Sequence, residues 1–227
     1  MHSGSPHPTP TQPRVKPRLR GVSHRYASIA ALLPCLLLIW DAPSGRATLA
    51  SAVYAGSLVG LLATSALYHG IDWSPRARFW VARLDLLMIF VLIAGTYTPI
   101  AMLRLEPGLA SFVLAGVWGI VLCGGVLKTL WAEPPKWASA AIYVGVGSVA
   151  VLFLPQVITA IGVPATALLV LGGVLYVAGA IVYGLQRPDP LPATFGYHEI
   201  FHVLVIAGAA VHFVAIAVYV IPGSPQT

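Results

Sequence analysis

Long apolar stretches, separated by short polar segments, make up most of the chain after its first 25 residues. Most of them approach the roughly 20 residues that a helix needs to cross the hydrocarbon core of a bilayer. The breaks hold turn-forming and charged residues, as in Glu106-Pro107-Gly108. The pattern predicts an all-α, polytopic membrane protein, a bundle of seven transmembrane helices. The predicted spans cover residues 26–40, 47–68, 84–103, 109–127, 137–154, 163–185 and 197–221.

Composition supports this class, because 58% of the residues are hydrophobic, 9% are charged and the mean hydropathy is +0.84. A soluble domain does not have such a composition. The net charge of +6 comes from basic residues in the segments between apolar stretches, so we interpret them as orientation signals and expect no nucleic-acid partner. The expected partners are membrane lipids. Cys35 and Cys123 fall inside apolar stretches, where we expect buried thiols and no disulfide.

The chain divides into three parts. Residues 1–22 are rich in Pro, Ser and Thr and end in basic residues, which predicts a disordered basic N-terminal tail. The same segment could begin a signal peptide, but its polar lead is too long for that pattern. The transmembrane domain is expected over 23–222 and a short C-terminal tail over 223–227.

The basic residues also predict the orientation. Of the 13 Lys and Arg, all but Arg46 and Arg104 fall in the tail or in the segments that lie on its side of the membrane. Cytoplasmic segments carry such an excess. The N-terminus is therefore expected in the cytoplasm and the C-terminus outside. The basic residues of the N-terminal side are Arg14, Lys16, Arg18, Arg20, Arg25, Arg76, Arg78, Arg83, Lys128, Lys136 and Arg187.

Candidate chemistry gathers at one predicted depth. His198 and His202 are four residues apart, so on a helix they share one face. His69 ends the second span and Asp85 begins the third, which puts both at the same cytoplasmic level. Ionisable side chains within a membrane are costly and mark function by default. The alternative is a set of interfacial histidines that are hydrogen-bonded to backbone or headgroups.

Three imidazoles with one open position form a common catalytic zinc site. We therefore expect zinc at His69, His198 and His202. Asp85 is the candidate catalytic carboxylate; it could bind the metal, or act by a hydrogen bond to the metal's water or to an imidazole. Ser65, four residues before His69, either supports this site or satisfies its own backbone.

The remaining polar residues of the spans are assigned other roles. Glu199 is adjacent to His198 and should point away from the metal. His212 lies ten residues beyond His202, about 15 Å along a helix, so we expect it to serve packing or hydrogen bonding. His24 is expected just before the first span.

Several motifs together resemble the hemolysin III family, the bacterial branch of the progestin and adipoQ receptor (PAQR) membrane proteins. The motifs are Ser65-Ala66-Leu67-Tyr68-His69, Arg83-Leu84-Asp85, the run 89–99 ending in Gly95-Thr96-Tyr97-Thr98-Pro99, and His198-xxx-His202. The resemblance implies seven membrane helices with a cytoplasmic N-terminus in the bacterial cytoplasmic membrane. It also implies zinc on the three histidines, with Asp85 and Ser65 near the metal, and kinship with ceramidase-like metal hydrolases.

The chain departs from the family pattern at two places. Asp85-Leu86-Leu87 stands where many members have Asp-His-Ser, and the region 23–28 lacks a Glu-x-x-Asn motif. The expected function is a zinc-dependent hydrolase of a lipid amide or ester. The alternatives are a non-enzymatic regulator of membrane state with a structural zinc, and a pore-forming cytolysin, which is disfavoured because no span carries a charged stripe.

Overall fold

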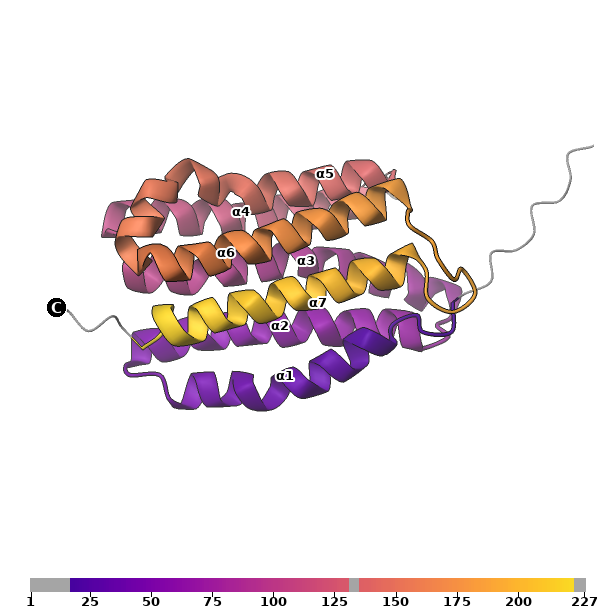
Figure 1. Cartoon of the computed structure of the whole chain (residues 1–227), viewed down its shortest axis with the longest axis horizontal. Helices are drawn as coiled ribbons and strands as arrows, with labels where there is room; N and C mark the ends of the chain where they lie inside the picture. Colours follow the sequence, from indigo (N-terminus) through magenta and orange to yellow (C-terminus); the bar gives the residue numbers. More distant parts are fainter. Residues whose placement is uncertain (1–16, 131–134, 223–227) are drawn as a thin grey trace, which may run out of the picture.

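The computed structural model describes residues 17–130 and 135–222, and within these ranges the secondary structure is helical, with no strand beyond an isolated bridge between Leu191 and Phe195. The prediction of an all-α fold is therefore confirmed. Figure 1 shows the helices as one elongated bundle. They are α1 (Val22–Trp40), α2 (Gly45–Gly70), α3 (Pro75–Arg104), α4 (Pro107–Leu130), α5 (Lys136–Gly147), the 3₁₀ segment η1 (Ser148–Phe153), α6 (Leu154–Leu185), α7 (Tyr197–Ala215) and the π-helical turn η2 (Ile216–Val220).

Six helical stretches are long and apolar enough to cross a membrane. One of them, Lys136–Leu185, has 50 residues and joins two predicted spans. As one straight helix it would be about 75 Å long, over twice the roughly 30 Å hydrocarbon core. Instead, Gly162 has the non-helical angles φ 79° and ψ 165°, and α5 packs against α6. Figure 1 shows the two helices side by side after the chain turns back. The count of seven spans remains a prediction.

Several helices begin earlier than the apolar pattern predicted. α3 begins at Pro75, capped by Ser74 Oγ, which accepts a hydrogen bond from Ala77 N at 3.4 Å. The predicted start at residue 84 was set by the charged residues before it. A charge keeps a residue out of the hydrocarbon core but does not keep it out of a helix. For the same reason Asp85 lies well inside α3. α1 begins at Val22, so His24 lies within it, and its expected position before the first helix is wrong.

Two hydrophobic clusters hold the bundle together. The larger one joins α1, α2, α3, α6, α7 and η2 around Tyr54, Leu58 and Ile216. The second joins α3 to α4 and α5 around Phe90 and Val117. Large apolar side chains also remain exposed on the outer faces of the helices. Lipid tails are the medium that such faces require, in agreement with membrane spans.

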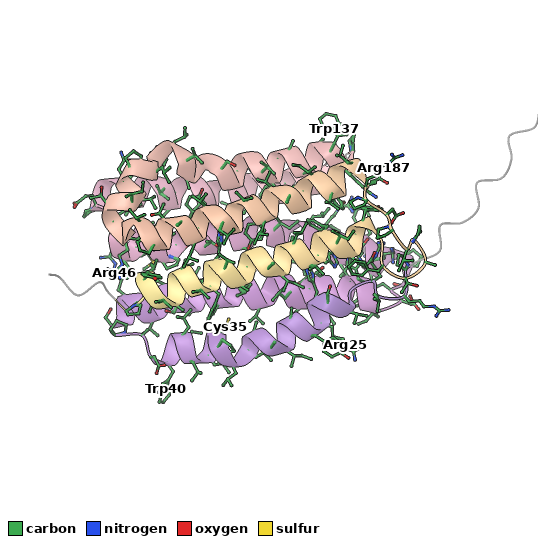
Figure 2. The ribbon with its side chains drawn as sticks, viewed as in Figure 1. Arg25, Cys35, Trp40, Arg46, Trp137 and Arg187 are labelled. Atoms are coloured by element: carbon green, nitrogen blue, oxygen red, sulfur yellow. The ribbon has the colours of Figure 1, made fainter. Side chains whose placement is uncertain are left out.

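The bundle has two chemically different ends. Figure 2 shows Arg25, Arg187 and Trp137 at one end, and Arg46 and Trp40 at the other. We call the first the basic end; it carries the start of α1, the α2–α3 connection and the α6–α7 loop. Residues 1–16 of the N-terminal tail predicted over 1–22, and the C-terminal tail predicted over 223–227, lie outside the described residues. Pro17–Gly21, the last part of the N-terminal segment, are described and contact the α6–α7 loop.

Candidate metal centre

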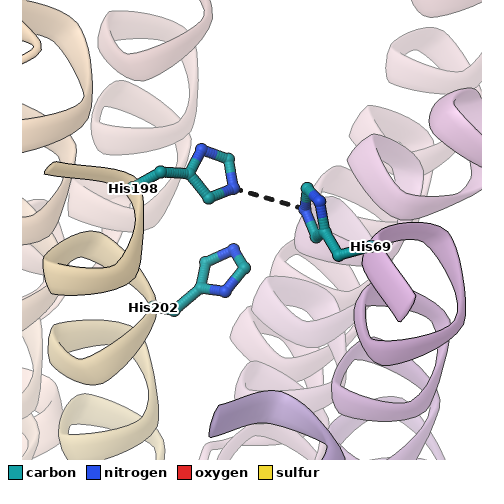
Figure 3. Close-up of side chains that lie close together, drawn as sticks. All are labelled: His69, His198 and His202. Atoms are coloured by element: carbon teal, nitrogen blue, oxygen red, sulfur yellow. Dashed lines mark hydrogen bonds between the residues drawn. The ribbon is translucent and has the colours of Figure 1, made fainter. Parts of the chain in front are cut away.

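Three histidines meet at the basic end, between α2 and α7. His69 lies in the last turn of α2, and His198 and His202 occupy successive turns at the start of α7. Figure 3 shows the three rings directed into the same space. The Nε2 atoms of His69 and His198 are 3.2 Å apart, and one potential ligand atom of each histidine lies within 4.8 Å of the other two. The structure thus brings together the three residues that the sequence selected.

This geometry fits a metal ion of the zinc type. Zn–N bonds of about 2.0–2.1 Å in tetrahedral geometry place ligand nitrogens about 3.4 Å apart, close to the spacing of His69 and His198. His202 is 2% exposed, and its Nδ1 has no hydrogen-bond partner in the described part of the chain. Buried imidazole nitrogens without protein partners suit metal ligation, because a metal needs the neutral ring with a free lone pair.

The start of α7, which carries His198 and His202, is fixed by hydrogen bonds. Glu199 Oε2 accepts a hydrogen bond from Gly196 N at 2.8 Å, and Asp189 Oδ1 accepts one from Tyr197 N at 3.0 Å. These contacts satisfy amide groups that the first helical turn leaves unpaired. Gly196 is required because a Cβ there would lie 2.3 Å from Asp189 Oδ1. As expected, Glu199 points away from the metal ligands, and it forms an ion pair with Arg20.

The segment before α1 packs directly against the centre. Arg18 N and Leu19 N donate hydrogen bonds to the carbonyls of Ala193 and Thr194, at 3.0 and 3.2 Å. Gly21 then adopts a left-handed conformation with φ 81°, and a Cβ on it would lie 2.6 Å from the Cβ of His69. Only glycine combines this backbone angle with so close an approach. The N-terminal segment is therefore part of the wall around the histidines.

His24 is a neighbour of the centre that the sequence did not assign to it. Its ring stacks on His202 with centroids 4.0 Å apart and an interplanar angle of 8°. It is 3% exposed, and neither ring nitrogen has a hydrogen-bond partner within the described ranges. The available signal was its position at the basic end. The apolar pattern placed His24 before the first span, so the sequence analysis did not group it with the three histidines.

Asp85 and Ser65 lie beside the histidines. Asp85, on α3, is not a member of the cluster of potential metal ligands among the described residues. It lines a cavity of about 280 Å³ that also reaches His69 and His198. Ser65 is buried on α2, and its hydroxyl neighbours the Asp85 carboxyl. The arrangement places a carboxylate in the wall of the same cavity as two imidazoles, where it could act on a ligand or a water molecule.

His212 lies away from the centre, as the spacing predicted. Its Nε2 lies 2.9 Å from the carbonyl oxygen of Leu169, and its ring contacts Tyr176 edge-on with centroids 5.2 Å apart. Gly172 makes room for the ring, since a Cβ there would lie 2.1 Å from it. These contacts tie α6 to α7 and serve packing.

Comparisons with known proteins match most of the chain. The family model described as "Haemolysin-III related" matches residues 13–213. "Hemolysin-3" of Bacillus cereus is 29% identical over 204 residues, covering 88% of this chain and 90% of the relative. "Monocyte to macrophage differentiation factor" of Homo sapiens is 26% identical over 171 residues, covering 74% and 68%. "Heptahelical transmembrane protein 4" of Arabidopsis thaliana is 30% identical over 183 residues, covering 72% and 46%.

Proposed function

The chain belongs to the haemolysin-III related family and is a multi-pass protein of the cell membrane; from this premise we propose that it is a zinc-dependent hydrolase of a lipid amide or ester. The observation that carries the proposal is a cluster of three imidazoles, two of which, His69 and His198, line a cavity together with Asp85. Bound zinc would lower the pKa of its water to about 7 and polarise the substrate carbonyl.

Residues of the chain would bind the metal, accept the proton, position the carboxyl and exclude water. The three histidines would hold the metal, and Asp85 would accept a proton from the attacking water across the cavity. Ser65 would hold the carboxyl of Asp85 in place, since its hydroxyl is adjacent to it. The N-terminal segment and the rings around His198, among them Tyr183 with centroids 5.8 Å away, would limit access of bulk water.

A regulator of membrane state with a structural zinc is the second candidate. The observation that favours it is that the ligands come from α2 and α7, far apart in sequence, so a metal would also tie the bundle together. The experiment is to incubate purified, zinc-loaded protein with total lipid extract and with sealed vesicles. Released fatty acid supports the hydrolase. Ion leakage without it supports the pore-forming alternative, and absence of both supports the regulator.

We also propose that the chain crosses the membrane seven times, with its N-terminus in the cytoplasm. The turn near Gly162, the packing of α5 on α6 and the printed name of the "Heptahelical" relative support the count. The basic end supports the orientation. A reporter that works only outside the cell should be active after Thr227 and inactive in the α2–α3 connection over residues 71–74. The opposite result at either position would contradict the topology.

A further inference from the structure

The cavity beside the histidines has a charge pattern that the proposed chemistry does not require. Among the residues that the structure describes, its wall contains the cations Arg20, Arg78 and Lys136, against one lining carboxylate, Asp85. The cations come from the N-terminal segment, from α3 and from the start of α5. A concave site lined by charges of one sign concentrates ligands of the opposite sign. Hydrolysis of a neutral amide or ester needs no such excess.

Each cation is held in place by a neighbouring side chain. The Arg78 guanidinium lies 5.3 Å from the centroid of the Tyr68 ring. Lys136 Nζ contacts the Tyr197 hydroxyl and lies 4.8 Å from the centroid of that ring. Both tyrosines line the cavity as well. Lys136 and Arg20 are partly buried, whereas Arg78 is exposed. Cations that are already positioned lose less side-chain entropy when they bind a ligand, so the first two favour a recognition site over a solvated charge.

Arg20 is the third cation, and its partner is the carboxylate Glu199 rather than an aromatic ring. Its Nε donates to Glu199 Oε1, and the side chain is 19% exposed, compared with 2% for Glu199. The ion pair fixes the guanidinium at the cavity wall beside His198. Arginine in such a fixed position recognises anionic oxygens through several N–H groups at once.

We propose that this cavity binds a phosphate group, either in the headgroup of a membrane lipid or in a soluble phosphate ester. Three cations from three separate segments match a tetrahedral phosphate, whose oxygens point in several directions, better than a planar carboxylate. The volume of about 280 Å³ is at the small end of ligand pockets, so it accepts a headgroup and leaves acyl chains in the membrane. A phosphate bound at these cations places the amide or ester bond of the same ligand next to the histidines. This last step rests on the proposed function.

Binding of matched ligand pairs tests the proposal. The full chain, purified in a maltoside detergent that contains no phosphate, is titrated with glycerol 3-phosphate and with glycerol, by calorimetry. A second arm compares retention of phosphatidic acid and of diacylglycerol by native mass spectrometry. The phosphate-bearing member of at least one pair should bind and its partner should not. Binding in the first arm identifies a soluble ester, and binding in the second alone identifies a lipid headgroup. Equal behaviour within both pairs overturns the proposal.

Matched variants separate the cavity from general surface charge. Arg78→Gln and Lys136→Gln should each weaken phosphate binding about tenfold, the loss of one charge-assisted hydrogen bond. Arg76→Gln and Arg187→Gln remove exposed cations of the same end that do not line the cavity, and should leave affinity within about twofold. Lys136→Arg should retain binding. Similar losses in all four Gln variants would overturn the proposal.

The same assay distinguishes this inference from the proposed function. Phosphate binding requires only the cations, so it should persist in wild-type protein that a chelator has depleted of zinc. Persistent binding without any lipid hydrolysis by the zinc-loaded wild type would support the cavity and refute the hydrolase. Hydrolysis of lipids with equal rates in wild type and Arg78→Gln, without phosphate binding, would support the hydrolase and overturn the cavity.

Discussion

The two ends of the bundle use polar side chains in opposite ways. At the end away from the histidines, Arg104 donates to the carbonyls of Tyr219 and Val220, with distances between 2.7 and 3.0 Å. These are carbonyls that the end of a helix leaves unpaired. At the basic end, polar side chains from different segments of the chain face one another, as in the pairs His69–His198 and Arg20–Glu199, and a cavity remains among them.

A comparison within α7 shows the same difference. His212 is bonded to the Leu169 carbonyl and packed on Tyr176, so its surroundings account for its presence. His202 is bonded to no backbone group among the described contacts and faces other imidazoles. A polar group that pairs with the backbone serves the fold. Polar groups gathered around a space need a further partner, which indicates a ligand or a metal.

The largest expected effect tests this difference directly. His69→Ala, His198→Ala and His202→Ala should each abolish stoichiometric zinc in purified protein, because two imidazoles alone hold the ion poorly. The loss of zinc affinity should exceed the roughly 10–100-fold that follows removal of a residue hydrogen-bonded to a metal ligand. Metal analysis after competition with a chelator measures it. His212→Ala is the matched control on α7 and should keep its zinc; equal loss there would show only that the bundle unfolds.

Asp85→Asn should impair activity even when zinc is saturating. The change keeps the size of the side chain but removes its negative charge and basicity, and general-base contributions reach about 10²–10⁴ in rate. Zinc occupancy is measured beside product formation, or beside the membrane phenotype where no substrate is known. Full function in the zinc-saturated variant would contradict the assigned mechanism and favour a structural metal.

Arg20→Gln and Arg104→Gln compare the two ends by stability. Removing Arg20 leaves Glu199 buried without its cation, which should lower the free energy of unfolding by about 3 kcal/mol. Removing Arg104 costs hydrogen bonds to carbonyls only, about 1–2 kcal/mol. Zinc affinity should fall in the first variant alone. Chemical unfolding in detergent and chelator competition give the two readouts, and an equal fall in affinity would remove the distinction between the ends.

The smallest effect is expected at His24. His24→Ala removes the ring stacked on His202 and should weaken zinc binding by up to about tenfold, the size of an aromatic contact of about 0.5–1.5 kcal/mol. His24→Phe keeps a flat ring and should restore most of the affinity. Chelator competition with both variants is the measurement. If phenylalanine fails as badly as alanine, the ring nitrogens of His24 contribute and stacking alone is the wrong account.

The helical class, the helices around each apolar stretch and the three histidines could be predicted from sequence. The length of an apolar stretch and the four-residue spacing of His198 and His202 are local properties of the sequence. In a membrane protein, the position of a residue within a span also gives its depth in the bilayer. Helix starts were harder, because α3 continues through Arg76 and Arg83 at the membrane surface. Hydropathy predicts where a helix enters the hydrocarbon core, and it does not predict where the helix begins.

Side-to-side contacts were decided only by the tertiary structure. Sequence placed His69, Asp85 and His202 near one depth, but depth leaves the angle around each helix and the neighbours of each helix open. Close packing of α6 on α7, and of Gly21 on His69, set those angles. They also bring His24 onto His202 and Arg20 onto Glu199. Periodicity along one helix fixes which residues share a face, whereas the partner of that face depends on packing between segments far apart in the chain.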